Sequence, residues 1–266
     1  MMARKSTRVL LPFVTFGVFI GVWYLFSEVV MAPERRFLVP PPHEVWKVAI
    51  ATNVNRTELL QGLWVTTRVS AVGLAVAIAI GVAVAVVMSQ TKWLEQSIFP
   101  YAILLQVVPI LAIVPLIGLI LGFGFLARVI VVAIFSLWPI INNTLFGLKS
   151  ADPDMHNLFS LKRASRWSRF FRLQLPASLP AMFQGFRIGA GAAVIGAIVG
   201  EFFFRRGQAG LGILLDRYRA QLRTPELFGA IFFSVILGVA VFWFFGFLAN
   251  RFTGKWYVPN EEGEPA

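Results

Sequence analysis

The chain has 266 residues, of which 58% are hydrophobic and only 14% charged. A soluble globular protein carries about a quarter charged residues, so this composition predicts an all-α polytopic membrane protein. The chain has no cysteine, which excludes disulfides, thiolate nucleophiles and cysteine metal sites. Its 24 Lys and Arg exceed its 13 Asp and Glu. Because much of this charge flanks apolar stretches, membrane lipid is the expected partner and nucleic acid is not.

Six apolar stretches predict six transmembrane helices. The first follows Arg4, Lys5 and Arg8 and is longer than a signal-peptide core of about 7–15 residues, so we interpret it as a retained helix. The predicted spans are 9–30, 63–88, 98–121, 125–148, 181–204 and 227–249. Between and after them lie external segments 31–62 and 205–226, a cytoplasmic loop 149–180, and an acidic tail 260–266 that we expect to be disordered.

The orientation in the membrane follows from the first basic cluster. Lys and Arg divide almost evenly between the two faces, so their total hardly distinguishes them. Arg4, Lys5 and Arg8 flank the first span closely, and positive residues favour the cytoplasmic side. We therefore expect both termini in the cytoplasm.

The cytoplasmic loop 149–180 contains two helix starts. Asp152 is a good N-cap, Pro153 suits the first helical position, and Asp154 favours the positive end of the helix dipole. Ser165 can cap a second helix, whose arginines recur every third residue and can reach lipid headgroups. The prolines at 176 and 180 then predict a bend before the fifth span.

At these residues the sequence resembles the membrane permease subunits of ABC importers, in the branch that takes up nitrate, sulfonates, taurine and similar solutes. The family signature has Glu-Ala-Ala, then Gly, then an apolar-x-Leu-Pro run. Residues 164–167 and 175–180 match its tail, whereas Asn157-Leu158-Phe159 replaces Glu-Ala-Ala and Arg163 replaces Gly. The resemblance extends over most of the chain, and its other matching segments are 38–42, 109–115 and 210–212.

This resemblance implies the type I ABC importer permease fold and a place in the bacterial cytoplasmic (inner) membrane. It implies a translocation path for a nitrate-, sulfonate- or taurine-type anion delivered by a periplasmic or lipid-anchored solute-binding protein. A vitamin or precursor, such as a pyrimidine or riboflavin, is an alternative solute. The implied partners are a second copy or close paralogue and two cytoplasmic ATPase subunits, which bind ATP and Mg; this chain needs no cofactor or metal.

The chain itself has no nucleotide site. Its Gly254-Lys255 pair is followed by Trp and lacks the glycine of a P-loop, so we expect it not to be an enzyme. The resemblance makes residues 152–165 a docking helix for the ATPase, the alternative being an ordinary interfacial loop. The expected coupling residues are Asp154, His156, Leu158, Phe159, Leu161, Arg163, Ala164 and Ser165. A membrane scaffold or membrane-embedded enzyme remains the alternative from another class.

Polar residues within spans are costly and therefore indicate candidate path residues. We expect Gln106, Pro109, Asn142 and Glu201 to line the translocation path, against the alternative that they bond between helices or reach the headgroups. Asn143 is a weaker candidate, and Arg187 is better explained by packing or by reaching the headgroups.

Small residues and arginines mark two further features. Gly185, Gly189, Ala193 and Ala197 recur every fourth residue and predict close helix packing. A cationic set in the second external segment could dock a binding protein or attract an anion, or could simply be solvated; it consists of Arg205, Arg206, Arg217, Arg219 and Arg223. His43 and His156 fall on opposite sides of the membrane and predict no metal site.

Overall fold

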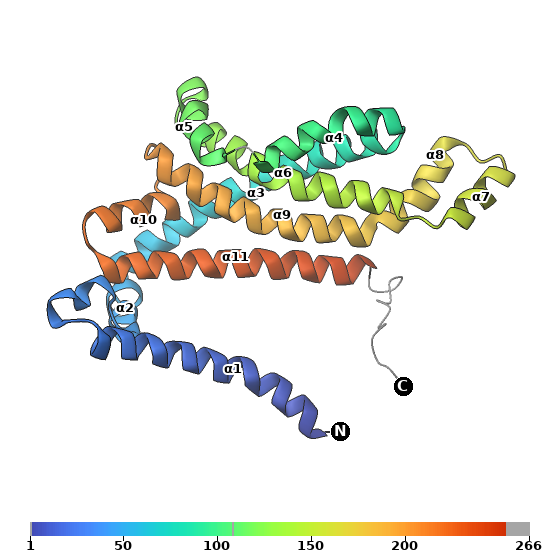
Figure 1. Ribbon diagram of the computed structural model, residues 1–266. Coiled ribbons are helices and arrows are strands. Elements are labelled where there is room, and N and C mark those ends of the chain that lie inside the picture. Colours follow the sequence, from blue (N-terminus) through green and yellow to red (C-terminus); the bar gives the residue numbers. More distant parts are fainter. Residues whose placement is uncertain (1, 108, 254–266) are drawn as a thin grey trace.

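The computed structural model describes residues 2–107 and 109–253, and this part of the chain is helical with no strand (Figure 1). Its helices are α1 (Met2–Leu25), α2 (Pro42–Val45), α3 (Asn53–Ser89), α4 (Lys92–Val107), α5 (Ile110–Leu121), α6 (Phe125–Lys149), α7 (Pro153–Leu161), α8 (Arg166–Arg169), α9 (Leu175–Phe204), α10 (Leu211–Ala220) and α11 (Thr224–Thr253). Shorter helical turns cover Phe26–Val30, Pro33–Leu38, Trp46–Ala51 and Phe170–Gln174. The predicted all-α membrane fold is confirmed. The predicted tail 260–266 lies outside the described residues.

Five of the described helices are long and apolar enough to cross a membrane, and there are six if α4 and α5 together form one span. The predicted span 98–121 is divided between these two helices, which are bent by 96° relative to each other. Pro109 stands at the N-terminus of α5 and has no N–H to continue the hydrogen-bond ladder. A second difference concerns α3, which begins at Asn53 and so turns part of the predicted external segment into helix.

The predicted bend before the fifth span is wrong, because α9 is continuous from Leu175 to Phe204. Pro176 lies in the first turn of α9, directly after the helical turn Phe170–Gln174, and the backbone stays helical through it. Pro180 is accommodated inside the helix, and both prolines therefore leave the helix unbroken.

The core forms where α9 packs against α6 and α3. A Cβ added to Gly185 would approach the Pro139 carbonyl to 2.9 Å, and one added to Gly189 would approach Ile140 side-chain atoms to 3.0 Å. Ala193 and Ala197 are buried in the same contact, within a cluster completed by Val69, Leu74, Ala77, Val132, Ala133, Ile140 and Ala190. The small residues thus let the helix axes approach closely, as their spacing predicts.

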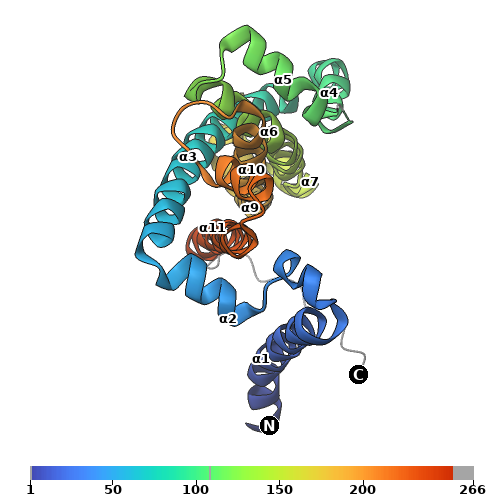
Figure 2. The same ribbon diagram turned by 90° about the vertical axis from the view of Figure 1, so that its left-hand side faces the viewer.

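The outer helices are much less covered than this core. Only 6% of the apolar window of α1 is buried, and α11 has the same value. Figure 2 shows α1 apart from the helices that surround α9. Helices α7 and α8 lie at one end of the bundle and α10 lies at the other, and the start of α1 and the end of α11 lie at the α7 end (Figure 1).

Candidate functional site

The first candidate site is the docking hairpin, residues 152–169, which comprises α7 and α8. The Asp152 carboxylate accepts a hydrogen bond from the Asp154 N–H at 2.7 Å, and Pro153 begins the helix. The Ser165 hydroxyl accepts one from the Ser168 N–H at 3.2 Å. Both predicted helix starts are therefore confirmed. The sequence can predict them because each capping side chain bonds only to the first turn of its own helix.

The end of α7 contains a left-handed residue. The Ala164 N–H donates to the Phe159 carbonyl and the Arg163 N–H to the Ser160 carbonyl, both at 3.0 Å, which is the Schellman pattern. This pattern places Arg163 at φ +48°, a conformation that favours glycine. The replacement of Gly by Arg in the signature therefore leaves the turn in place and adds backbone strain.

Arg163→Gly should relieve this strain and stabilise the end of α7 by about 0.5–1 kcal/mol. Hydrogen exchange of the Ala164 amide should then slow by about two- to fivefold. Arg166→Gly is the matched control: position 166 is helical, so glycine there should speed local exchange. Faster exchange in Arg163→Gly would contradict the assignment of strain.

The docking hairpin presents apolar side chains without burying them. No residue of α7 is buried; Leu158 is 42% exposed and Leu161 is 83% exposed, while His156 and Phe159 are half-buried. The Arg169 guanidinium donates to the Ser160 hydroxyl at 2.8 Å and so links α8 to α7. Exposed apolar residues on an ordered hairpin at the end of the bundle are typical of a contact surface.

The predicted path residues are not brought together. Gln106 and Pro109 are exposed at the break between α4 and α5, and Asn142 is half-buried on α6. The neighbouring Asn143 amide donates to the Pro139 carbonyl at 2.8 Å within the same helix. Glu201 lies near the end of α9, toward α10. Their role in a path stays a prediction.

Glu201 is fully buried and ties three helices together. Thr66 Oγ1 of α3 lies 2.9 and 3.1 Å from its two carboxylate oxygens, and the Gly212 N–H of α10 donates to Oε2 at 2.9 Å. Thr66 Oγ1 also accepts from the Leu211 N–H at 2.8 Å. The carboxylate thus lies at the N-terminus of α10, where unpaired N–H groups and the dipole favour negative charge. A Cβ on Gly210 would overlap this carboxylate.

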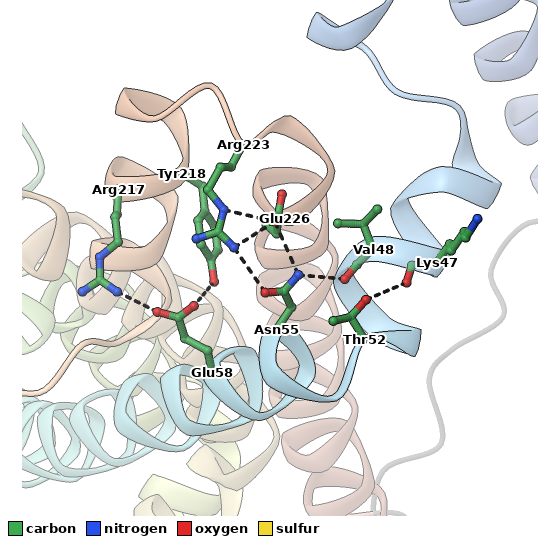
Figure 3. Close-up of polar contacts among 9 residues, drawn as sticks. All are labelled: Lys47, Val48, Thr52, Asn55, Glu58, Arg217, Tyr218, Arg223 and Glu226. Carbon is green, nitrogen blue, oxygen red and sulfur yellow. Dashed lines mark hydrogen bonds and ion pairs between the residues drawn. The ribbon is translucent and has the colours of Figure 1, made fainter.

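Most of the predicted cationic set in the α10 segment, residues 205–223, is ion-paired, with four arginines sharing three carboxylates. Arg205 and Arg219 each pair with Asp216 at 2.9 Å. Arg217 pairs with Glu58 at 2.6 Å and Arg223 with Glu226 at 2.8 Å, as Figure 3 shows. Arg206 has no such partner among the described residues. These pairs lower the free charge that the segment offers to a binding protein.

The contacts in Figure 3 join α10 to α3 and α11. The Tyr218 hydroxyl donates to Glu58 at 2.7 Å, and the Arg223 guanidinium donates to Asn55 at 3.2 Å. Burial, followed by the bond to Glu58, raises the pKa of Tyr218, so its hydroxyl remains a donor at neutral pH. The bond to Glu226 raises the pKa of Arg223.

Arg187 packs against an aromatic ring, and its buried Nε has no hydrogen-bond partner among the described residues. Its guanidinium carbon lies 3.7 Å from the centroid of the Phe242 ring, which is a close cation–π contact. This contact agrees with the expected packing role. No group of three or more His, Cys, Asp or Glu that could hold a metal occurs in residues 2–107 and 109–253.

Sequence reasoning missed two residues of the α10 end. Thr66 falls within the predicted span 63–88, and nothing in the sequence pairs it with Glu201, 135 residues away. Arg128 lies near the start of a predicted span, where a charged residue is itself a signal. It is 3% exposed, and its guanidinium donates to the Gln208 carbonyl at 3.0 Å.

The chain is similar to known membrane transport proteins over most of its length. The family model described as binding-protein-dependent transport system inner membrane component matches residues 77–254. The formylaminopyrimidine transport permease of Halalkalibacterium halodurans is 28% identical, covering 90% of this chain and 93% of that protein. The nitrate import permease of Leptolyngbya laminosa is 27% identical, with coverage of 94% and 88%. The bicarbonate transport system permease of Synechocystis is 28% identical, with coverage of 89% and 86%.

Proposed function

The chain belongs to the family of binding-protein-dependent transport system inner membrane components and is the permease of an ABC importer, and from this premise we propose how it couples to its partners. Two ATP-hydrolysing subunits bind at the docking hairpins of two permease chains, which are copies of this chain or this chain and a close paralogue. A solute-binding protein docks at the α10 end and releases its solute into a path between the two permeases.

One observation carries this proposal: an ordered hairpin with exposed apolar residues begins where α6 ends and continues into α9. Closure of the ATPase dimer would displace the hairpin, and α9 would move with it because Phe170–Gln174 continues directly into that helix. Such coupling requires a two-state element on which both ATP and solute act.

The proposed solute is a small anion of the nitrate, sulfonate or taurine type. The name of one relative specifies nitrate and that of another bicarbonate, which supports an anion. The name of a third specifies formylaminopyrimidine, which supports a vitamin precursor as the second candidate. Binding assays on the solute-binding protein that stimulates uptake through this chain would distinguish these two classes.

The proposed orientation puts the docking hairpin in the cytoplasm and α10 outside. Because the chain has no cysteine, a single Gln208→Cys substitution gives a clean probe at an exposed position of the α10 segment. It should react with a membrane-impermeant thiol reagent in intact cells. Lys162→Cys, exposed on the docking hairpin, is the matched control and should react only after permeabilisation. The reverse pattern would overturn this orientation.

A tagged copy of the chain should co-purify with a separate ATPase subunit when the membrane is solubilised gently. Failure to recover an ATPase, together with catalysis by the isolated chain, would favour the membrane-enzyme alternative. Recovery of neither an ATPase nor catalysis would favour a scaffold.

A further inference from the structure

A cavity of about 300 Å³ lies at the α10 end, between α3, the start of α6 and the α10 segment. Arg68 of α3 and Arg128 of α6 line it together with Gly124 and Phe125, and residues 206–208 complete the wall. We call it the arginine pocket. It is distinct from the docking hairpin and from the Glu201 tie described above.

The arginine pocket gathers positive charge that is not neutralised locally. Among the described residues, Arg68, Arg128 and Arg206 have no carboxylate within ion-pair distance, unlike the four paired arginines of the α10 segment. Arg206 lies 5.4 Å from the Phe123 ring centroid and Arg68 6.0 Å from that of Phe125. Glu201 partly offsets the charge of Arg128, but one carboxylate cannot balance three guanidinium groups. A net positive charge therefore remains at the pocket.

Arg128 builds the wall of this pocket. It is 3% exposed, and it donates to the carbonyls of Arg206 and Gln208. These bonds hold the turn at Gly207, whose φ of +86° favours glycine. The Nε of Arg128 is buried and has no hydrogen-bond partner among the described residues, so Arg128 shapes the pocket through its two bonded nitrogens, Nη1 and Nη2.

The N-terminus of α6 adds backbone N–H donors and a partial positive charge to the pocket. Gly124 is its N-cap, and no side chain caps the first turn of this 25-residue helix. Gly124 and Phe125 both line the pocket, so the helix presents its unpaired N–H groups and positive dipole end there. A helix N-terminus together with three guanidinium groups is a strong combination for binding an oxyanion.

We propose that the arginine pocket binds a small free oxyanion, such as nitrate or a sulfonate group. Arg68 and Arg206 contact the anion, and Arg128 positions the turn that carries Arg206. The further role of receiving solute at the external mouth rests on the orientation proposed above, but binding itself does not. This inference deepens the proposed function by locating a binding site for the solute class.

The test uses the purified full chain alone, with nitrate and methanesulfonate as probes and chloride at equal ionic strength as reference. The thermal unfolding midpoint should rise with either probe more than with chloride. In the double variant Arg68→Gln/Arg206→Gln, the concentration that gives half the rise should increase about tenfold or more. Arg219→Gln is the matched control, since it removes a positive charge from the α10 segment while Asp216 still forms its ion pair with Arg205. It should respond like wild type.

A second arm distinguishes a free anion from a lipid headgroup. The measurement is repeated in nanodiscs of phosphatidylcholine with and without phosphatidylglycerol. Stabilisation by phosphatidylglycerol that needs Arg68 and Arg206, without a response to the free probes, would overturn the proposal in favour of a headgroup site. Equal responses of wild type and double variant would overturn it too. No ATPase or binding protein is present, so neither result bears on the coupling at the docking hairpin.

Discussion

Leu158→Asp should reduce ATP-coupled uptake by about thirtyfold or more while the protein still inserts into the membrane. Leu158 is 42% exposed on α7, which has no fully buried residue, so its loss should leave the membrane-spanning core intact. In the proposed complex the new carboxylate would lie desolvated in an apolar groove of the ATPase, at a cost of about 2–5 kcal/mol. Uptake into proteoliposomes and stimulation of ATP hydrolysis by the binding protein measure the effect. Phe159→Ala should act in the same direction but less strongly.

Leu222→Asp controls for the substitution itself. Leu222 is 61% exposed at the opposite end of the bundle, and its φ of +56° is one that Asp tolerates better than Leu. This variant should therefore still co-purify with the ATPase subunit, whereas Leu158→Asp should lose that association. Wild-type coupled turnover in Leu158→Asp would remove the docking assignment, whatever the result at Leu222.

Glu201→Ala should lower the free energy of unfolding by about 2–5 kcal/mol. The substitution leaves the Gly212 N–H and the Thr66 hydroxyl without their acceptor in a buried position. Helix α10 would then lose the charge at its N-terminus and part of its attachment to α3 and α9. Thermal unfolding of the purified chain, together with hydrogen exchange over Leu211–Ala220, measures both consequences.

Three variants sharpen this second experiment. Glu201→Gln keeps the shape and one acceptor, so it should be milder than Ala. Thr66→Val should approach the effect of Glu201→Ala, because it removes both the donor to Glu201 and the acceptor for Leu211. Glu34→Ala removes an exposed carboxylate and should leave stability unchanged. If Glu201→Ala lowered the free energy of unfolding no more than Glu34→Ala does, the hydrogen bonds of Glu201 would not contribute to stability.

The features that the sequence predicts well depend on neighbouring residues. Asp152 and Ser165 cap helices within their own first turns, so short-range chemistry is sufficient to place them. The small residues Gly185 and Gly189 likewise act through their size alone, and they lie where α9 meets α6. The long apolar runs also mark membrane helices, because composition decides whether a segment can enter lipid.

The features that the sequence does not predict depend on contacts between distant residues. Glu201 bonds to Thr66, which lies on another helix and 135 residues away in the sequence. Arg217 was expected to contribute free charge, yet Glu58, 159 residues away, pairs with it. A count of charges cannot identify such partners. The unpaired group formed by Arg68, Arg128 and Arg206 is visible only once the folded chain brings three segments together.

Helix α9 connects the two ends of the bundle through one continuous helix. Its 30 residues extend about 45 Å, enough to traverse the hydrocarbon layer with length to spare. Its N-terminus joins the hairpin through Phe170–Gln174. Near its C-terminus, the Glu201 carboxylate accepts a hydrogen bond from α10. Because one helix joins the hairpin to the Glu201 carboxylate, a displacement at one end of α9 would reach the other end through a single element.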